Sequence, residues 1–186
     1  PLMLQPRWGD LRLSLQSDQR ARLALEPSIY LKRSALNGGN EFQTSLEINV
    51  RPSSRLEIEI EPRYTHASIG AQYVSTMDAA GFAPTFGSRY FFGEVARREL
   101  ALPTRINAAF SPTLSFQFFA QPLVSSGDYS NYKQLLSPSS FNFNRFREGT
   151  AVGSGEAVRC QGGATCVDAN AVRYFDLDGN GTPEHT

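Results

Sequence analysis

Long apolar runs are missing from these 186 residues. No run approaches the roughly 18 residues that a membrane-spanning helix needs, which excludes a helical membrane protein. A membrane barrel is not excluded, because lipid-facing residues occupy only alternate positions of its strands. Neither sign of charge is in excess, with 18 Lys and Arg against 18 Asp and Glu. A general nucleic-acid binder would carry a basic surface, so we expect no nucleic-acid partner.

Catalytic residue types are also scarce. The two histidines, His66 and His185, lie far apart in the chain, and no Gly-x-Ser-x-Gly motif, metal-binding histidine pair or phosphate-binding loop is present. These absences favour a protein that is not an enzyme. The chain begins at Pro1 without a signal segment and stops at Thr186 within a turn-like stretch, so we expect an internal piece of a longer protein.

Period-two alternation of apolar and polar residues is the dominant pattern. Its clearest instance is residues 56–61, where Leu, Ile and Ile alternate with three glutamates. Because successive side chains of a strand point to opposite faces, each such segment has one apolar and one polar face. The pattern predicts strands at residues 8–16, 20–33, 41–51, 55–73, 90–110 and 114–123.

Short and long connections alternate between these strands. The short ones lie at residues 17–19, 51–54 and 111–113, and the longer ones at 34–40, 75–88 and from about 125 onward. Membrane barrels have this asymmetry, and several predicted strands exceed the 9–11 residues that cross a bilayer. We therefore predict an all-β fold, an antiparallel up-and-down meander forming part of a transmembrane β-barrel. About six barrel strands fill residues 1–124, and residues 125–186 form a long irregular extracellular loop region.

Alternation alone does not say which face is buried. Apolar side chains point to lipid in a membrane barrel and inward in a soluble one. On the membrane interpretation, lipid contact is predicted for Leu56, Ile58, Ile60, Phe116 and Phe118, and a lumen-facing position for Glu57, Glu59 and Glu61. The glutamates are also spaced about 6.5–7 Å apart at i and i+2, which permits paired-carboxylate glycoside chemistry. A charge ladder paired with nearby arginines explains them more simply.

Two segments carry a family resemblance. They are RPSSRLEIEIEPRYTHASIGAQYV (51–74) and RYFFGEVARRELALPTRINAAFSPTLSFQFFAQPLVSSGDYSNYKQLLSP (89–138). Together they resemble the C-terminal outer-membrane barrel, a domain of unknown function, of large Gram-negative surface proteins that carry an N-terminal family-9-like carbohydrate-binding module. The resemblance covers roughly residues 40–140. It implies an outer-membrane location with further strands after Thr186, and it supplies no catalytic residues.

Both cysteines, Cys160 and Cys166, lie in the Gly-rich part of the loop region. In an oxidising compartment they would pair and close a small loop, whereas in the cytosol they would be free thiols. The expected export of the protein favours the disulfide.

The motif DLDGNGTPE (176–184) resembles a calcium-binding loop. Asp176, Asp178 and Asn180 stand at the first, third and fifth positions, and a backbone carbonyl near Thr182 and a water-mediated contact from Glu184 would follow. The twelfth-position acid is missing and no helices flank the motif. An ordinary Asp/Asn/Gly-rich turn is the alternative, so no cofactor is certain and calcium is the only candidate.

Taken together, the sequence favours a structural or transport-type outer-membrane barrel segment without catalytic activity. Its expected partners are outer-membrane lipid and the remaining strands of the same barrel or of a parent protein. Two alternatives stay open: a soluble or surface-exposed carbohydrate-binding β-sandwich and a fragment of an exported hydrolase.

Overall fold

The computed structural model describes residues 3–153, 157–178 and 180–183. It divides into two compact units, which are described separately. The sheet unit comprises residues 7–69 and 96–128, and the disulfide unit comprises residues 1–6, 70–95 and 129–186. Strands dominate both units, and the one described helical element is a 3-10 turn at Ala83–Thr85. The predicted all-β class is confirmed.

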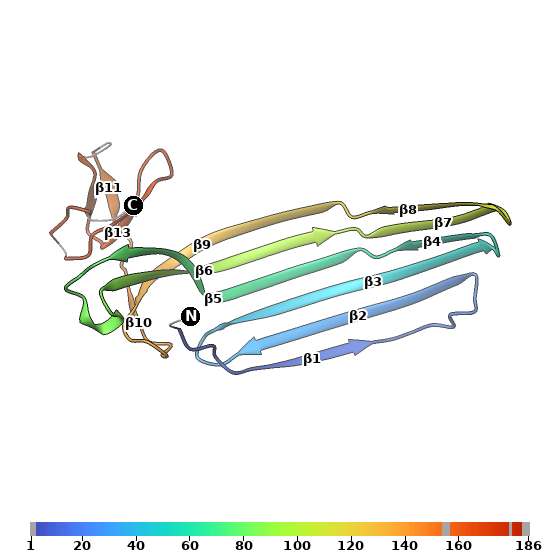
Figure 1. The fold of residues 1–186 in the computed structure, drawn as a ribbon, viewed down its shortest axis with the longest axis horizontal. Coiled ribbons are helices and arrows are strands. Elements are labelled where there is room, and N and C mark those ends of the chain that lie inside the picture. Colours follow the sequence, from blue (N-terminus) through green and yellow to red (C-terminus); the bar gives the residue numbers. More distant parts are fainter. Residues whose placement is uncertain (1–2, 154–156, 179, 184–186) are drawn as a thin grey trace. The chain divides into compact units, whose positions relative to one another are not determined.

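The long strands form an antiparallel meander. Their bounds are β1 Trp8–Ser14, β2 Leu23–Ser34, β3 Gly39–Ser53, β4 Leu56–Ile60, β5 Arg63–Asp78, β6 Ser88–Ala101, β7 Thr104–Ser111, β8 Leu114–Ala120 and β9 Leu123–Leu135. With the short β10 (Phe143–Arg145), the hydrogen-bonded order is β10-β9-β6-β5-β3-β4-β7-β8, with β1 paired to β2 and β2 to β3. Figure 1 shows β1, β2, β3, β4, β7 and β8 of the sheet unit side by side. Each strand pairs with a neighbour along the chain, as the sequence predicts.

Prolines divide three of these strands in two. Pro62 separates β4 from β5, yet β3 keeps one register with both, since Ile48 faces Ile60 and Ser45 faces Arg63. Pro103 separates β6 from β7, and Pro122 separates β8 from β9. A proline has no N–H to donate to the ladder, so the hydrogen bonding is interrupted while the strand direction continues. The predicted strands at 55–73 and 90–110 are therefore each one strand with a proline inside.

The predicted boundary at residue 124 falls inside β9, which continues to Leu135. Residues 124–131 are mainly Ser, Gly, Asp, Tyr and Asn, so the apolar alternation that marks the other strands disappears here. Backbone pairing needs no apolar side chains, which is why composition alone indicated a loop. The irregular region begins after Leu135.

Small hairpins build the rest of the disulfide unit. β11 (Thr150–Val152) pairs with β12 (Arg159–Gln161), and β13 (Thr165–Val167) pairs with β14 (Arg173–Phe175). Two apolar clusters support them. The first has Phe91, Tyr132 and Phe175 at its centre, and the second has Val158, Cys160 and Cys166. The region is compact although little of it is regular.

Candidate functional site

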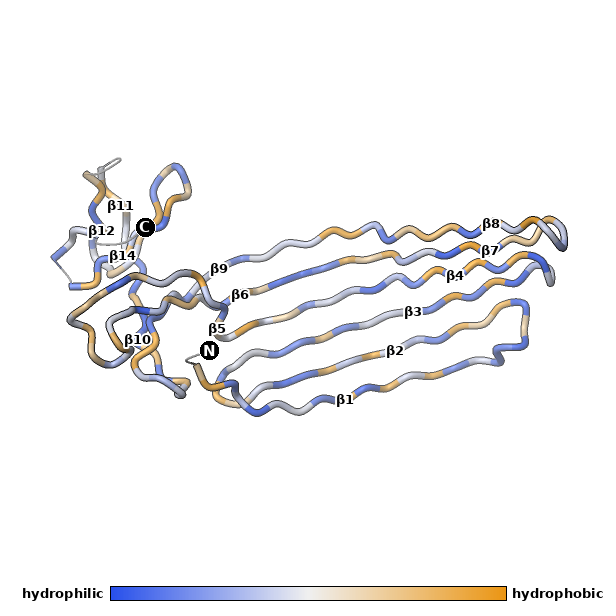
Figure 2. The backbone as a smooth tube through the Cα atoms, in the orientation of Figure 1, coloured by the Kyte–Doolittle hydropathy of each residue, from blue (hydrophilic) through white to orange (hydrophobic). Residues whose placement is uncertain are grey.

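Strand register gathers most of the apolar side chains of the sheet unit on one face. Across the strands run two rows of directly facing residues: Leu23, Val50, Ile58, Ile106 and Phe118; and Leu25, Ile48, Ile60, Thr104 and Ala120. A third row joins Leu56, Ala108 and Phe116. Figure 2 shows the alternation of hydrophobic and hydrophilic residues along these strands. We call this side the apolar face and the opposite side the polar face. All five residues predicted to contact lipid lie on the apolar face.

The two faces differ in exposure, in the opposite sense to a soluble protein. In β2, Leu23 and Leu25 of the apolar face are 53% and 37% exposed, whereas Ala24 between them is 2% exposed. In β3, Asn49 of the polar face is 7% exposed, and Ser45 is buried beside the Ser28 hydroxyl. Soluble domains bury their large apolar side chains and expose their polar ones. In β2 the large apolar side chains are the exposed ones, whereas the apolar residues of β4 are half-buried, like the glutamates between them.

A hydrogen-bonded network lies on the polar face around Glu57. Arg51 Nε lies 2.8 Å from Glu57 Oε1, and Asn49 Nδ2 donates to the same oxygen at 3.1 Å. Asn107 Nδ2 lies 3.5 Å from the other carboxylate oxygen. Arg51 also donates to the Gln19 carbonyl oxygen. The network therefore joins β4 to β3 and β7, and Arg51 connects it to the turn at Gln19.

The other predicted lumen glutamates also lie on the polar face. Glu61 accepts two hydrogen bonds from Arg63, at 2.7 and 2.8 Å, and Glu59 stands directly opposite Arg105. Glu57 and Glu61 are thus engaged by arginines of their own sheet. This pairing matches the charge ladder that the sequence favours. Because Glu57 and Glu61 are each bound by an arginine, these two glutamates do not form a free carboxylate pair for glycoside chemistry.

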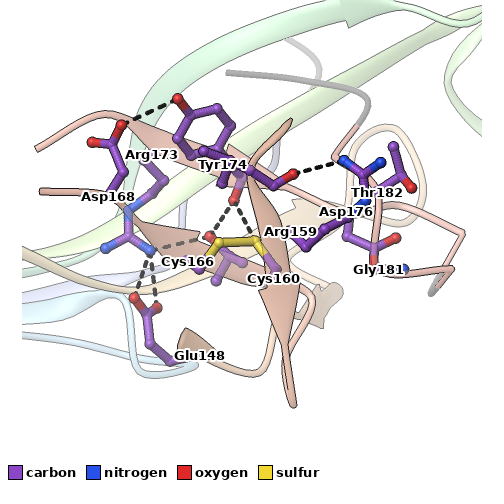
Figure 3. The surroundings of a disulfide bond; sticks show 12 residues. Glu148, Arg159, Cys160, Cys166, Asp168, Arg173, Tyr174, Asp176, Gly181 and Thr182 are labelled. Atoms are coloured by element: carbon purple, nitrogen blue, oxygen red, sulfur yellow. Dashed lines mark hydrogen bonds and ion pairs between the residues drawn. A yellow bond between two sulfur atoms is a disulfide. The ribbon is translucent and has the colours of Figure 1, made fainter. Parts of the chain in front are cut away.

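The predicted disulfide is confirmed. The Cys160 and Cys166 sulfurs are 2.04 Å apart, and their Cα atoms are 5.4 Å apart. Cys160 is in β12 and Cys166 in β13, so the bond joins the two hairpins (Figure 3). Both cysteines are buried against Val158, with Ala151 and Tyr174 packed around them.

Polar contacts hold the hairpin of β13 and β14 on either side of the disulfide. Arg173 Nη1 donates to both Glu148 carboxylate oxygens at 2.9 Å, and its guanidinium lies 3.9 Å from the centre of the Tyr132 ring. Asp168 accepts backbone hydrogen bonds from Asn170 and Val172, each at 2.9 Å, and one from the Tyr174 hydroxyl. The backbone donor of Val172 is the main cause that holds the pKa of the Asp168 carboxyl below its ordinary value.

The calcium-like motif has a turn's own hydrogen bonds. Asp178 accepts from the Asn180 backbone, Asn180 Oδ1 accepts from the Thr182 backbone at 2.7 Å, and Asp176 accepts from the Gly181 backbone at 2.7 Å. Figure 3 shows Asp176 beside Gly181 and Thr182. Glu184 lies outside the described residues. Within the described ranges no three His, Cys, Asp or Glu side chains are arranged to hold a metal ion. Calcium at this turn stays a prediction.

A buried lysine in the disulfide unit was not predicted. Lys133 is 2% exposed, its ammonium lies 3.3 Å from Glu94, and it donates to the Gly70 carbonyl oxygen. Asn131 and Arg145 also contact the Glu94 carboxylate. These residues come from three distant segments with no motif in common. No local pattern in the sequence could have brought them together.

Among the residues that the structure describes, no helix is long and apolar enough to cross a membrane. Comparison with protein-family models, with curated proteins and with solved structures found no match to this chain.

Proposed function

We propose that this chain is a structural or transport-type segment of an outer-membrane β-barrel, with no catalytic activity of its own. The observation that carries the proposal is the reversed exposure at several positions of the sheet unit. Leu23, Leu25 and Phe118 are exposed on one face, while Ala24 and Asn49 are buried on the other. Apolar side chains facing lipid and polar side chains facing a lumen require this arrangement.

The length of the apolar face supports the proposal. In five strands, counted through any proline, the residues of the apolar face are interrupted by at most a threonine, and the run ends at a polar or basic residue; the run of β1, residues 11–15, is shorter. The runs are residues 23–31, 42–50, 56–64, 100–110 and 114–124, and the residues that follow them toward the same rim are Arg33, Asn40, His66, Arg98 and Ser126. Each run is nine to eleven residues long, and a tilted strand crosses the hydrocarbon core in about 9–11 residues.

The apolar band also runs obliquely across the strands. One row of facing residues, which contains three prolines, serves as the reference for position along the strands. Hydrogen bonds and registers align in this row Leu15, Pro27, Leu46, Pro62, Leu102 and Pro122. In β1 the apolar run is centred two residues from this row, toward the rim where β2 ends. In β8 and β9 it is centred three residues away, toward the opposite rim. From one strand to the next, the centre of the apolar run therefore shifts by about one residue on average. With a rise of about 3.3 Å per residue and a strand spacing of about 4.8 Å, this shift corresponds to strands tilted by roughly 35° from the normal to the apolar band. Membrane barrel strands tilt about 35–45°.

The polar face suits a hydrated lumen. It carries charges of both signs that pair with each other, Arg51 with Glu57 across two strands and Arg63 with Glu61 along one strand. Two of its buried atoms, Asn49 Oδ1 and Arg63 Nε, find no hydrogen-bond partner within the described residues. Buried polar atoms of this kind are commonly satisfied by water, which a lumen would supply.

The resemblance of residues 51–74 and 89–138 to the outer-membrane barrel domain of large Gram-negative surface proteins fits the same proposal. The partners would be outer-membrane lipid and the remaining strands of the barrel. A carbohydrate-binding sandwich would need to cover the apolar face, and Leu23 and Phe118 are exposed. Glycoside chemistry at residues 57–61 would need two free carboxylates, whereas Glu57 is paired with Arg51 and Glu61 with Arg63.

Cysteine labelling in intact membranes tests the proposal. Single cysteines replace Ile58, Ile60, Glu57 and Glu59 in turn. Cys160 and Cys166 give no background because they are disulfide-bonded. A membrane-impermeant thiol reagent should modify positions 57 and 59 through the lumen and leave positions 58 and 60 unmodified. Labelling of 58 and 60 without 57 and 59 would reverse the faces and refute the proposal.

A further inference from the structure

A hollow of about 550 Å³ lies within the sheet unit, across β1, β2, β3 and β5. Seven of its lining residues fall in two adjacent register rows, and both rows lie on the apolar face. One row contains Leu11, Leu31, Phe42 and His66, and the other contains Gly9, Arg33 and Asn40. The three remaining lining residues, Asp10, Lys32 and Glu41, alternate with these rows, so their side chains lie on the polar face. These three residues therefore line the hollow mainly with their backbone, which forms its floor.

Gly9 leaves open space at one edge of the hollow. A Cβ added at Gly9 would meet no atom within 4 Å, so the space above it is open. Beside it, Leu11, Leu31 and Phe42 form an apolar wall, and these side chains are 52%, 43% and 38% exposed. Their exposed apolar surface has the chemistry to hold an acyl chain.

The row of the hollow that contains Arg33 and Asn40 is basic and polar. Arg33 is exposed, and no described carboxylate forms an ion pair with it. His66 and Asn40 add hydrogen-bonding groups, and none of the seven apolar-face lining residues is acidic. Arg33 is also the residue at which the apolar run of β2 ends, the level at which lipid head groups meet a membrane protein. The charge therefore complements an anion at the head-group level.

We infer that this hollow binds one lipid with a phosphate-bearing anionic head group, an inference that rests on the proposed membrane location. The acyl chain lies along Leu11, Leu31 and Phe42, and the phosphate pairs with the Arg33 guanidinium. Arginine is suited to this role because its planar donors bind phosphate oxygens two at a time. Basic pockets on membrane proteins recognise anionic head groups by the same chemistry.

Native mass spectrometry of the full chain in mild detergent tests the inference, with phosphatidylglycerol and phosphatidylcholine of identical acyl chains as probes. The anionic lipid should bind about fivefold or more tightly than the zwitterionic one, the effect of one arginine near an anionic head group. Arg33→Gln should abolish this preference. Arg20→Gln is the matched control, because it removes the same charge from a residue in the turn before β2, away from the hollow, and should leave the preference unchanged.

A second variant tests the cavity independently of charge. Gly9→Leu fills the open space without a clash and should weaken binding of both lipids. Inorganic phosphate in millimolar excess should not displace the lipid, because the apolar wall contributes to binding; displacement would overturn the assignment to a lipid. Equal binding of the two lipids, or a preference that survives Arg33→Gln, would also overturn it. Flotation with vesicles separates these failures from failure of the proposed function, since a chain that does not float is no membrane protein.

Discussion

Placing an arginine at successive depths of one strand distinguishes a lipid-facing surface from an ordinary apolar core. In β8, Phe118 lies near the centre of the apolar run 114–124, and Leu114 lies at its end. The two residues are four positions apart, which at the rise of a tilted strand separates them by roughly 11 Å in depth. Phe118→Arg should therefore destabilise the protein by about 2–4 kcal/mol, and Leu114→Arg by about 0–1 kcal/mol.

Gln117→Arg is the matched control, because Gln117 precedes Phe118 but lies on the polar face opposite Asn107. It is exposed, and its substitution should change the stability by no more than about 0.5 kcal/mol. The free energy of unfolding is measured by guanidinium titration in phosphatidylcholine vesicles, followed by gel mobility and circular dichroism. Equal costs for Leu114→Arg and Phe118→Arg, or a large cost for Gln117→Arg, would contradict the placement of the bilayer along this strand.

Three further outcomes are expected in the disulfide unit. Replacing Cys160 and Cys166 by serine should lower its stability by about 2 kcal/mol, because the bond closes a short loop between positions that differ by six; limited proteolysis that is the same with and without the bond would contradict this. Folding lowers the pKa of Asp168, so its carboxylate should stabilise the hairpin fully at any pH above the ordinary pKa of an aspartate. This stabilisation should be lost as the pH falls through the lowered pKa. Asp168→Asn should remove that acid sensitivity in a pH titration of hairpin protection, and an unchanged profile would exclude the carboxylate as its source. If the turn binds calcium, added calcium should slow proteolysis within residues 170–178 relative to a chelator, and Asp178→Ala should abolish this difference. Identical cleavage with calcium, with the chelator and in the variant would show that the motif is only a turn.

Local alternation was enough to predict most of the sheet unit. The Leu, Ile and Glu pattern of residues 56–61 indicates a strand and its two faces, and the register with β3 and β7 confirms both. The closely spaced Cys160 and Cys166 pointed to the disulfide for a similarly local reason. These features depend on neighbours in the chain, which a single sequence displays directly.

Features that depend on distant partners were not predictable. β9 extends through Ser125 and Asp128 because its backbone pairs with other strands, and its side chains carry no alternation. The Lys133 and Glu94 pair joins two strands that are far apart in sequence. The exposure of Leu23 against the burial of Ala24 depends on how the whole sheet is arranged, so alternation alone could not decide between the two faces.

Fluorescence quenching by lipids with brominated acyl chains tests the central claim most directly. Trp8 is the only tryptophan and is replaced by phenylalanine, after which single tryptophans are introduced at Phe118 and at Gln117. The two positions are consecutive residues on opposite faces of β8. If the apolar face contacts lipid, brominated chains should strongly quench a tryptophan at position 118, most effectively with bromines near the bilayer centre, and barely affect one at 117. Equal quenching at both positions, or stronger quenching at 117, would contradict the account.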